Sequence, residues 1–312
     1  MSISKNFNFS PDQMADIESE YVYAVGYLEW FHLGVRRLRS GFESALSSGN
    51  AEKGYQAAAL SIMLSIISGE KKLTLLLKEV DYYLHLLETY SNEMMRTYLL
   101  IYRKTISMLI DKGEATSIGA NDDAGEGDDL PQVFLDMVYV NGSLQSYWLG
   151  HKERCCHFAQ KCFDSLPSPG REYRVIVLFY YGLAVIDMLK KKMNTRKQKE
   201  VNEIVSSMRV ATSHAESNFR NKLELLQAEQ YALVGHHSQA VTAYDTAIAS
   251  AKNCEFIHEE GLACEKAGLY FKRIRDVQKA IRYFDRARLC YDEWGSRMKV
   301  EIIEKELSAL NG

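Results

Sequence analysis

One helical pattern occurs twice near the C-terminus of this chain. The pattern places a small residue, an aromatic residue and a small residue at positions i, i+4 and i+7, as Ala240, Tyr244 and Ala247 and again as Ala280, Phe284 and Ala287. At about 100° per residue these positions form a narrow stripe on one face of an α-helix, which lets a neighbouring helix approach closely. Repetition every 40 residues indicates stacked helix hairpins. The sequence therefore predicts an all-α superhelix, a solenoid of antiparallel helix hairpins.

The helix that precedes each stripe also has a repeated pattern. A small residue and an aromatic residue lie twelve and nine positions before the first alanine of each stripe, as Ala228 and Tyr231 and as Gly268 and Phe271. This arrangement resembles the tetratricopeptide repeat, whose usual period is about 34 residues. The longer period here predicts extended helices or loops.

The same register accounts for the densest group of cysteines. Cys155, Ala159 and Cys162 fall on the three stripe positions of an earlier hairpin, which predicts that both thiols pack in the interior. With the neighbouring Cys156 and His157 they could also suggest a zinc site. However, adjacent residues on a helix point about 100° apart, and no second ligand pair follows. We expect buried packing and no disulfides, with a redox-sensitive thiol as the alternative.

Helical segments and breaks divide the chain into five parts. Residues 1–10 are expected to be a flexible N-terminus, 11–112 N-terminal helical hairpins, 113–131 an acidic disordered insertion, 132–295 tetratricopeptide-like repeats, and 296–312 a C-terminal capping helix that starts at Ser296. The acidic segment carries six carboxylates and no basic residue, so it has almost nothing to bury. It could be an insertion between hairpins or a boundary between domains; an insertion is favoured.

Charge and hydropathy restrict the classes of partner. The net charge of −3 gives no overall electrostatic reason to expect nucleic acid or an anionic membrane surface. No apolar run approaches the roughly 20 residues that a membrane span needs, and residues 1–13 lack the features of a secretory signal. A cytoplasmic protein is therefore expected. The basic run 190–199 is expected to be a solvated connection, although it could bind phosphate or attract the acidic segment.

Motifs that support catalysis are missing from the sequence. It contains no phosphate-binding loop, dinucleotide fingerprint, zinc-protease helix, esterase elbow or kinase signature. The acidic segment lacks the spacing of a calcium loop. His236 and His237 are expected to be exposed residues of a turn. We therefore predict a protein that is not an enzyme, with no catalytic residue, metal or cofactor; an enzyme with an unrecognised site is the remote alternative.

The last fifty residues resemble a narrower class of repeat. Leu262-Ala263, Tyr270-Phe271, Ala287-Arg288, Cys290-Tyr291 and Trp294-Gly295 are similar to the helical-repeat region of large signalling proteins. In those proteins a serine/threonine kinase and a STAND-type AAA ATPase precede the repeats, and GAF and histidine-kinase modules often follow. The acidic insertion and Ser296 depart from that pattern. The resemblance implies a regulatory scaffold, while Tyr291 and Trp294 are expected to bury apolar area against the final helix, and Gly295 to reverse the chain.

The repeat register also tests for a known peptide-binding mode. Chaperone-binding tetratricopeptide domains hold a peptide carboxylate with Lys and Asn, but the matching positions here are Leu225 and Glu229. A groove would need other contacts, and the candidate interaction surface comprises Lys222, Glu229, Glu265, Lys272 and Arg273. The leading hypothesis is a non-catalytic scaffold for a protein or peptide partner. The alternative is a sensor arm, or detached fragment, of a multidomain signalling ATPase or kinase.

Overall fold

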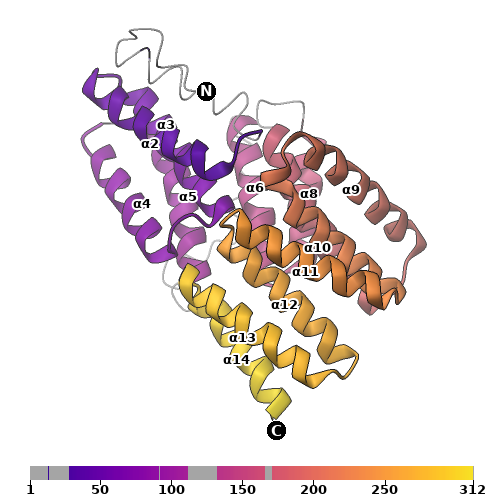
Figure 1. Ribbon diagram of the computed structural model, residues 1–312. Helices are drawn as coiled ribbons and strands as arrows, with labels where there is room; N and C mark the ends of the chain where they lie inside the picture. The colour runs from indigo at the N-terminus through magenta and orange to yellow at the C-terminus, as the bar shows by residue number, and fades with distance from the viewer. Residues whose placement is uncertain (1–12, 14–27, 91, 112–131, 166–170, 312) are drawn as a thin grey trace.

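The computed structural model describes residues 13, 28–90, 92–111, 132–165 and 171–311, and within them it contains thirteen long helices and no strand (Figure 1). The helices are α2 (Phe31–Ser47), α3 (Ala51–Ser68), α4 (Leu73–Leu87), α5 (Glu93–Ile110), α6 (Gln132–Trp148), α7 (Lys152–Asp164), α8 (Arg171–Lys191), α9 (Thr195–His214), α10 (Glu216–Val234), α11 (His237–Asn253), α12 (Ile257–Arg273), α13 (Val277–Trp294) and α14 (Arg297–Asn311). Among the described helices none is long and apolar enough to cross a membrane.

Local sequence signals define where many helices begin and end. The side chains of Asn50, Asn92, Asn194 and Asp276 each accept a hydrogen bond from the backbone N–H three residues later, at the start of α3, α5, α9 and α13. Gly295 ends α13 in the left-handed conformation, with φ of 87°, as expected for a residue that reverses the chain. These short polar and glycine residues therefore separate consecutive helices.

The helices pack as antiparallel hairpins that stack into a superhelix, as predicted. Consecutive helices pair as α6 with α7, α8 with α9, α10 with α11, and α12 with α13. The first helix of each hairpin also packs on the first helix of the next, so that α6, α8, α10 and α12 form a continuous inner layer, and α14 packs on α13. In Figure 1 this stack runs from α6 through the orange helices to the yellow C-terminal ones.

The repeated stripes lie in the interior, which confirms their predicted role. Ala240, Tyr244 and Ala247 and their counterparts Ala280, Phe284 and Ala287 have no measurable exposure. A methyl group added at Gly268 of α12 would come within 2.7 Å of the Phe284 ring, so the small residue is what allows the two helices to pack closely. The predicted packing of Cys155, Ala159 and Cys162 is also confirmed, since all three are buried.

The N-terminal hairpins contact the repeats at points far away in the sequence. The indole N–H of Trp30 donates to the backbone oxygen of Cys254 at 3.0 Å, and the backbone N–H of Phe31 donates to Asn218 at 3.1 Å. At the other end of these hairpins, the Ser296 hydroxyl donates to the backbone oxygen of Leu109 at 2.5 Å, and α5 packs on α14. The last described helix, α14, is thus joined directly to α5 of the N-terminal hairpins.

Some predictions differ from the structure in detail. The basic run 190–199, expected to be a solvated connection, already contains the start of α9 at Thr195, because Asn194 caps that helix. Trp294 is buried, and its ring packs 5.2 Å from that of Trp148 and 5.1 Å from that of His258. Ser296 caps α14, as predicted, by accepting a hydrogen bond from the N–H of Lys299. The predicted flexible residues 1–10 and acidic insertion 113–131 lie outside the described residues.

Candidate functional site

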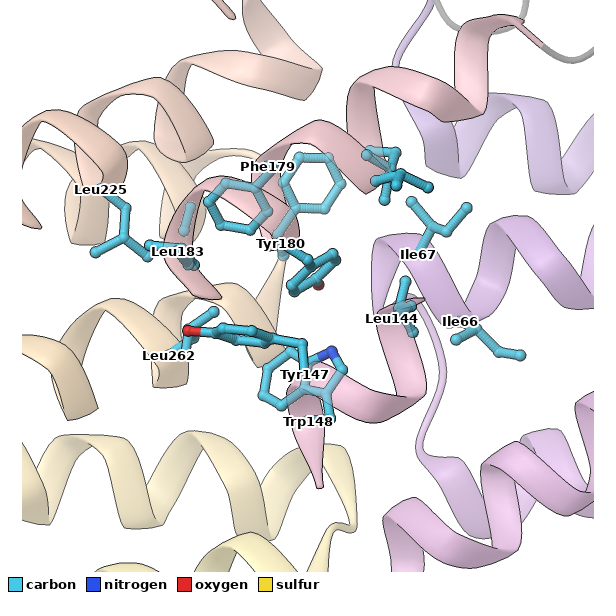
Figure 2. Packing of buried hydrophobic residues seen from close by; sticks show 14 of the residues in the cluster. Ile66, Ile67, Leu144, Tyr147, Trp148, Phe179, Tyr180, Leu183, Leu225 and Leu262 are labelled. Carbon is cyan, nitrogen blue, oxygen red and sulfur yellow. The ribbon is translucent and has the colours of Figure 1, made fainter. Parts of the chain in front are cut away.

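The end of helix α6 lies at the centre of the molecule. Figure 2 shows Tyr147 and Trp148 extending from α6 among side chains of the neighbouring helices, with Tyr180 above them and Leu262 beside Tyr147. The Trp148 ring lies 6.0 Å from the Tyr180 ring of α8 and 5.8 Å from the His258 ring of α12, and the Lys299 ammonium of α14 lies 5.8 Å from it. One aromatic side chain therefore brings together helices from several repeats.

A cavity opens beside these two aromatic residues. Its volume is about 190 Å³. The residues around it come from the end of α6, the turn before α7, and helices α7, α12 and α14: Tyr147, Trp148, Leu149, Gly150, Lys152, Leu262, Glu265, Lys266, Lys299 and Ile302. The cavity thus combines an aromatic wall with three ammonium groups.

A network of ion pairs extends from the cavity into the inner layer. The Asp187 carboxylate of α8 lies 2.7 Å from the ammonium of Lys266, 3.3 Å from that of Lys152 and 3.4 Å from that of Lys190. Lys190 and the hydroxyl of Tyr244 also donate to Glu229 of α10, and Lys266 lies 3.7 Å from the same carboxylate. Asp187 is therefore shared by three cations.

A second carboxylate, Glu265 in the cavity lining, is held by two donors. The Lys299 ammonium lies 2.6 Å from the Glu265 carboxylate, and the Tyr291 hydroxyl donates to Glu265 at 2.5 Å. The burial of Tyr291 therefore has a polar as well as an apolar cause. The side chains of Lys266 and Lys299 are only 6% and 7% exposed.

Burial and neighbouring charges shift the pKa values of Asp187, Lys266 and Lys152 in different directions. Burial alone would raise the pKa of Asp187, but the neighbouring Lys266, Lys190 and Lys152 overcome it and hold this pKa below its ordinary value. Burial opposes the charge of Lys266 as well, yet Asp187 raises the pKa of this lysine. In contrast, burial and then the charge of Lys266 lower the pKa of Lys152. The surroundings of Lys152 thus disfavour the charged form of this lysine.

A separate ion pair lies under the N-terminal hairpins. The ammonium of Lys222 is 2.7 Å from the Glu259 carboxylate, and both side chains are at most 1% exposed. Asn221 donates to the same carboxylate at 2.5 Å, and the Phe256 ring lies 4.5 Å from the ammonium. Next to this pair, burial and then the charge of Lys222 hold the pKa of His258 well below its ordinary value.

The five residues of the predicted interaction surface occupy three different places. Lys222 belongs to the buried pair just described, while Glu229 and Glu265 belong to the network around the cavity. Lys272 and Arg273 lie at the end of α12, where Lys272 pairs with Glu306 at 2.7 Å and Arg273 donates to the backbone oxygen of Ala232 at 2.7 Å. The five residues therefore do not form one continuous surface. Their role in binding stays a prediction.

The sequence interpretation missed most of the residues that line the cavity. One signal was present: Asp187 is the only charged residue in the apolar run 175–189 of α8, and an isolated charge in such a run indicates a buried partner. Lys152, Lys266 and Lys299 have no comparable signal, since each lies in a helix of mixed polar and apolar composition. Lys190, assigned to a solvated connection, instead turns inward to Glu229.

The described part of the chain contains no group of three or more side chains suited to hold a metal ion. Burial raises the pKa of Cys155 to about 12 and that of Cys156 to about 11, so neither thiol ionises readily near neutral pH. His236 and His237 are exposed at the turn before α11, as expected. The lining of the cavity offers ammonium groups, a carboxylate and aromatic side chains.

Comparison with the models of known protein families gives no match, and comparison with curated proteins gives none either.

Proposed function

We propose that the chain is a non-catalytic regulatory scaffold, built from tetratricopeptide-like repeats, that binds a protein partner in a reducing compartment such as the cytoplasm. The observation that carries the proposal is that the same buried pattern of small and aromatic residues recurs in two successive hairpins. The stripes of α11 and α13 are both fully buried. Of the small residues in the preceding helices, Ala228 is buried as well, and Gly268 leaves no room for a methyl group beside Phe284. Recurrent hairpins of this kind commonly serve as binding surfaces.

The outer rim of the last repeats is the surface that best fits such a partner. We define the rim as the exposed residues at the turns after α10 and α12, namely Val234, Arg273, Ile274, Arg275 and Val277. The two turns are adjacent, because Arg273 donates to Ala232 and the His237 imidazole is 2.7 Å from the Tyr270 hydroxyl. Val234, Ile274 and Val277 are each at least 40% exposed beside two arginines, which suits an acidic segment with apolar residues.

Affinity capture with matched variants tests this function. Ile274→Asp combined with Val277→Asp places charge on the rim, whereas Leu289→Asp changes a still more exposed apolar residue of α13 that is not part of the rim. We expect a protein that is retained by the wild type and by Leu289→Asp and lost from the rim variant. Equal recovery from all three would reject the rim, and no protein retained above an unrelated helical control would reject the scaffold.

The same experiment addresses the sensor-arm alternative, which the resemblance of the last fifty residues supports. If the retained protein is an ATPase or a kinase, its turnover is measured with and without the purified chain. A change in turnover that the rim variant abolishes would favour the sensor arm. Unchanged turnover would favour a free-standing adaptor.

A further inference from the structure

We propose that the cavity at the end of α6 binds a small oxyanion, either a carboxylate or a phosphate group. This site is independent of the rim and of the proposed scaffold function. It depends on the ammonium groups of Lys152, Lys266 and Lys299, which line one cavity with a single carboxylate, Glu265, among them.

The balance of charge is the first argument. Four lysines, 152, 190, 266 and 299, share three carboxylates, those of Asp187, Glu229 and Glu265. Asp187 is closer to Lys266 than to Lys152, so Lys152 has only a share of one carboxylate and the face of the Tyr147 ring, 3.8 Å from its ammonium. Buried cations are normally paired, and an added anion would complete this set.

The shape of the cavity is the second argument. About 15 Å³ is enough for one water molecule, so a volume of about 190 Å³ has room for a polyatomic anion with several waters. The Lys152 side chain is 21% exposed, whereas Lys266 is 6% exposed, so the cavity has an accessible cation and a buried one. An anion can therefore reach the site from solvent.

The backbone around the cavity adds a third contribution. Leu149 and Gly150 in the lining belong to the turn that leads into α7, a helix of thirteen residues. No side chain caps the first turn of α7, since its N-cap residue His151 makes no such hydrogen bond. The partial positive charge of a helix N-terminus adds to the attraction of the lysines for an anion.

Two substitutions separate charge from shape. Lys152→Met removes the accessible charge and keeps the length of the side chain, while Ile302→Trp fills the cavity and leaves every charge in place. Lys191→Met is the matched control, because it removes the same charge from an exposed position at the end of α8 outside the lining. Circular dichroism and urea unfolding establish that each variant is folded.

The full-length protein is titrated with inorganic phosphate and with acetate at constant ionic strength, with chloride as the reference. Trp148 in the lining and Trp294 beside it report binding through fluorescence. We expect saturable binding of at least one of the two ions. Its affinity should fall about tenfold or more in Lys152→Met, be lost in Ile302→Trp, and be unchanged in Lys191→Met.

The ion that binds more tightly shows whether the site prefers a carboxylate or a phosphate group.

Lysine NMR provides an independent readout, because an anion beside Lys152 would raise the pKa of its ammonium. The proposal is overturned if neither ion binds saturably to the wild type, or if Lys152→Met and Lys191→Met bind with equal affinity. If Ile302→Trp does not fold, the comparison of the two lysine variants decides alone.

Discussion

At the scale of single residues, the interior of this protein is organised by charges that compensate each other. Lys222 and Glu259 are both inaccessible to solvent and are held 2.7 Å apart under the aromatic residues at the start of α2. A buried ion pair adds little net stability, because desolvation offsets the attraction, but removing one partner leaves an isolated buried charge. Such a pair therefore disfavours alternative packings more than it stabilises the native one.

Lys222→Met should lower the free energy of unfolding by about 3–5 kcal/mol, because it leaves Glu259 charged and unpaired. The double variant Lys222→Met/Glu259→Gln should recover at least half of that loss, since a neutral amide can still accept from Asn221. Urea denaturation measures both. Arg220→Met, which breaks the exposed pair with Glu216, is the control and should cost less than about 0.5 kcal/mol. Equal losses in the single and double variants would contradict the role of charge.

The stability of the protein should fall as the pH falls from 7 to 5.5, in part through His258. A histidine in the unfolded chain titrates near pH 6.5, whereas burial and the charge of Lys222 hold the pKa of folded His258 well below that value. The unfolded state therefore binds the proton first, and stability is lost below pH 6.5 by up to about 1.4 kcal/mol per pH unit for this group.

Urea unfolding at a series of pH values tests the contribution of His258. The slope of stability against pH should be shallower in His258→Gln than in the wild type. His85→Gln, at an exposed histidine of α4, should keep the wild-type slope. A slope for His258→Gln that matches the wild type would place the titrating group elsewhere, with His32, whose pKa is also lowered by burial, as the next residue to test.

At the scale of elements, close approach of paired helices depends on glycine. A methyl group at Gly268 would meet the Phe284 ring at 2.7 Å, and one at Gly261 would meet the Tyr291 ring at 2.8 Å. Both glycines lie in α12 and both rings in α13, so this hairpin is held together along its length by small residues opposite aromatic ones. In α3, by contrast, a methyl group at Gly54 would find its nearest neighbour at an ordinary 3.5 Å.

Gly268→Ala should destabilise the protein by about 1–3 kcal/mol through overpacking. Gly54→Ala makes the same change in a helix with room for it, and should stabilise by about 0.5–1 kcal/mol through helix propensity. Thermal unfolding of both variants gives the comparison. A shift of the melting temperature in the same direction in both alanine variants would show that the close contact with Phe284 does not determine the stability of Gly268→Ala.

Elements with local signals could be predicted from the sequence, and contacts between distant elements could not. The stripe at Ala240, Tyr244 and Ala247 depends only on spacing within one helix, and Ser296 and Gly295 act on their immediate neighbours, so each was predicted correctly. Trp30 and Cys254, by contrast, are 224 residues apart and carry no pattern that pairs them. The cavity depends on such pairings, which is why only Glu265 of its charged residues was named in advance.

At the scale of the whole molecule, the N-terminal hairpins and the repeats form one structure. Asn218 of α10 accepts from the backbone N–H of Phe31 and donates to the backbone oxygen of Glu29, so one side chain satisfies two backbone groups where α2 meets the repeats. At the other end, Ser296 caps α14 and also donates to Leu109. Polar groups therefore join the two halves at two separate points.

Asn218→Ala should reduce hydrogen-exchange protection in α2, α3, α10 and α12 together, because it removes the two hydrogen bonds between this side chain and the backbone where α2 begins, at a cost of about 1–3 kcal/mol. Exchange measured by mass spectrometry on peptides from each helix provides the test. Asn202→Ala, which removes an exposed contact with Gln230, is the control and should leave the protection of these helices unchanged. Loss of protection confined to α2 and α3 would show that the hairpins unfold independently.

The contact between α5 and α14 has a mechanical consequence. In an open array of helical repeats each unit touches only its neighbours, so the array can stretch and twist like a spring. Here the Ser296 hydroxyl bonds to α5, and α14 packs on α5. The last described helix is therefore connected to a helix near the beginning of the chain as well as to its neighbour α13. Stretching the array would therefore have to break the contact between α5 and α14 as well as the contacts between neighbouring repeats.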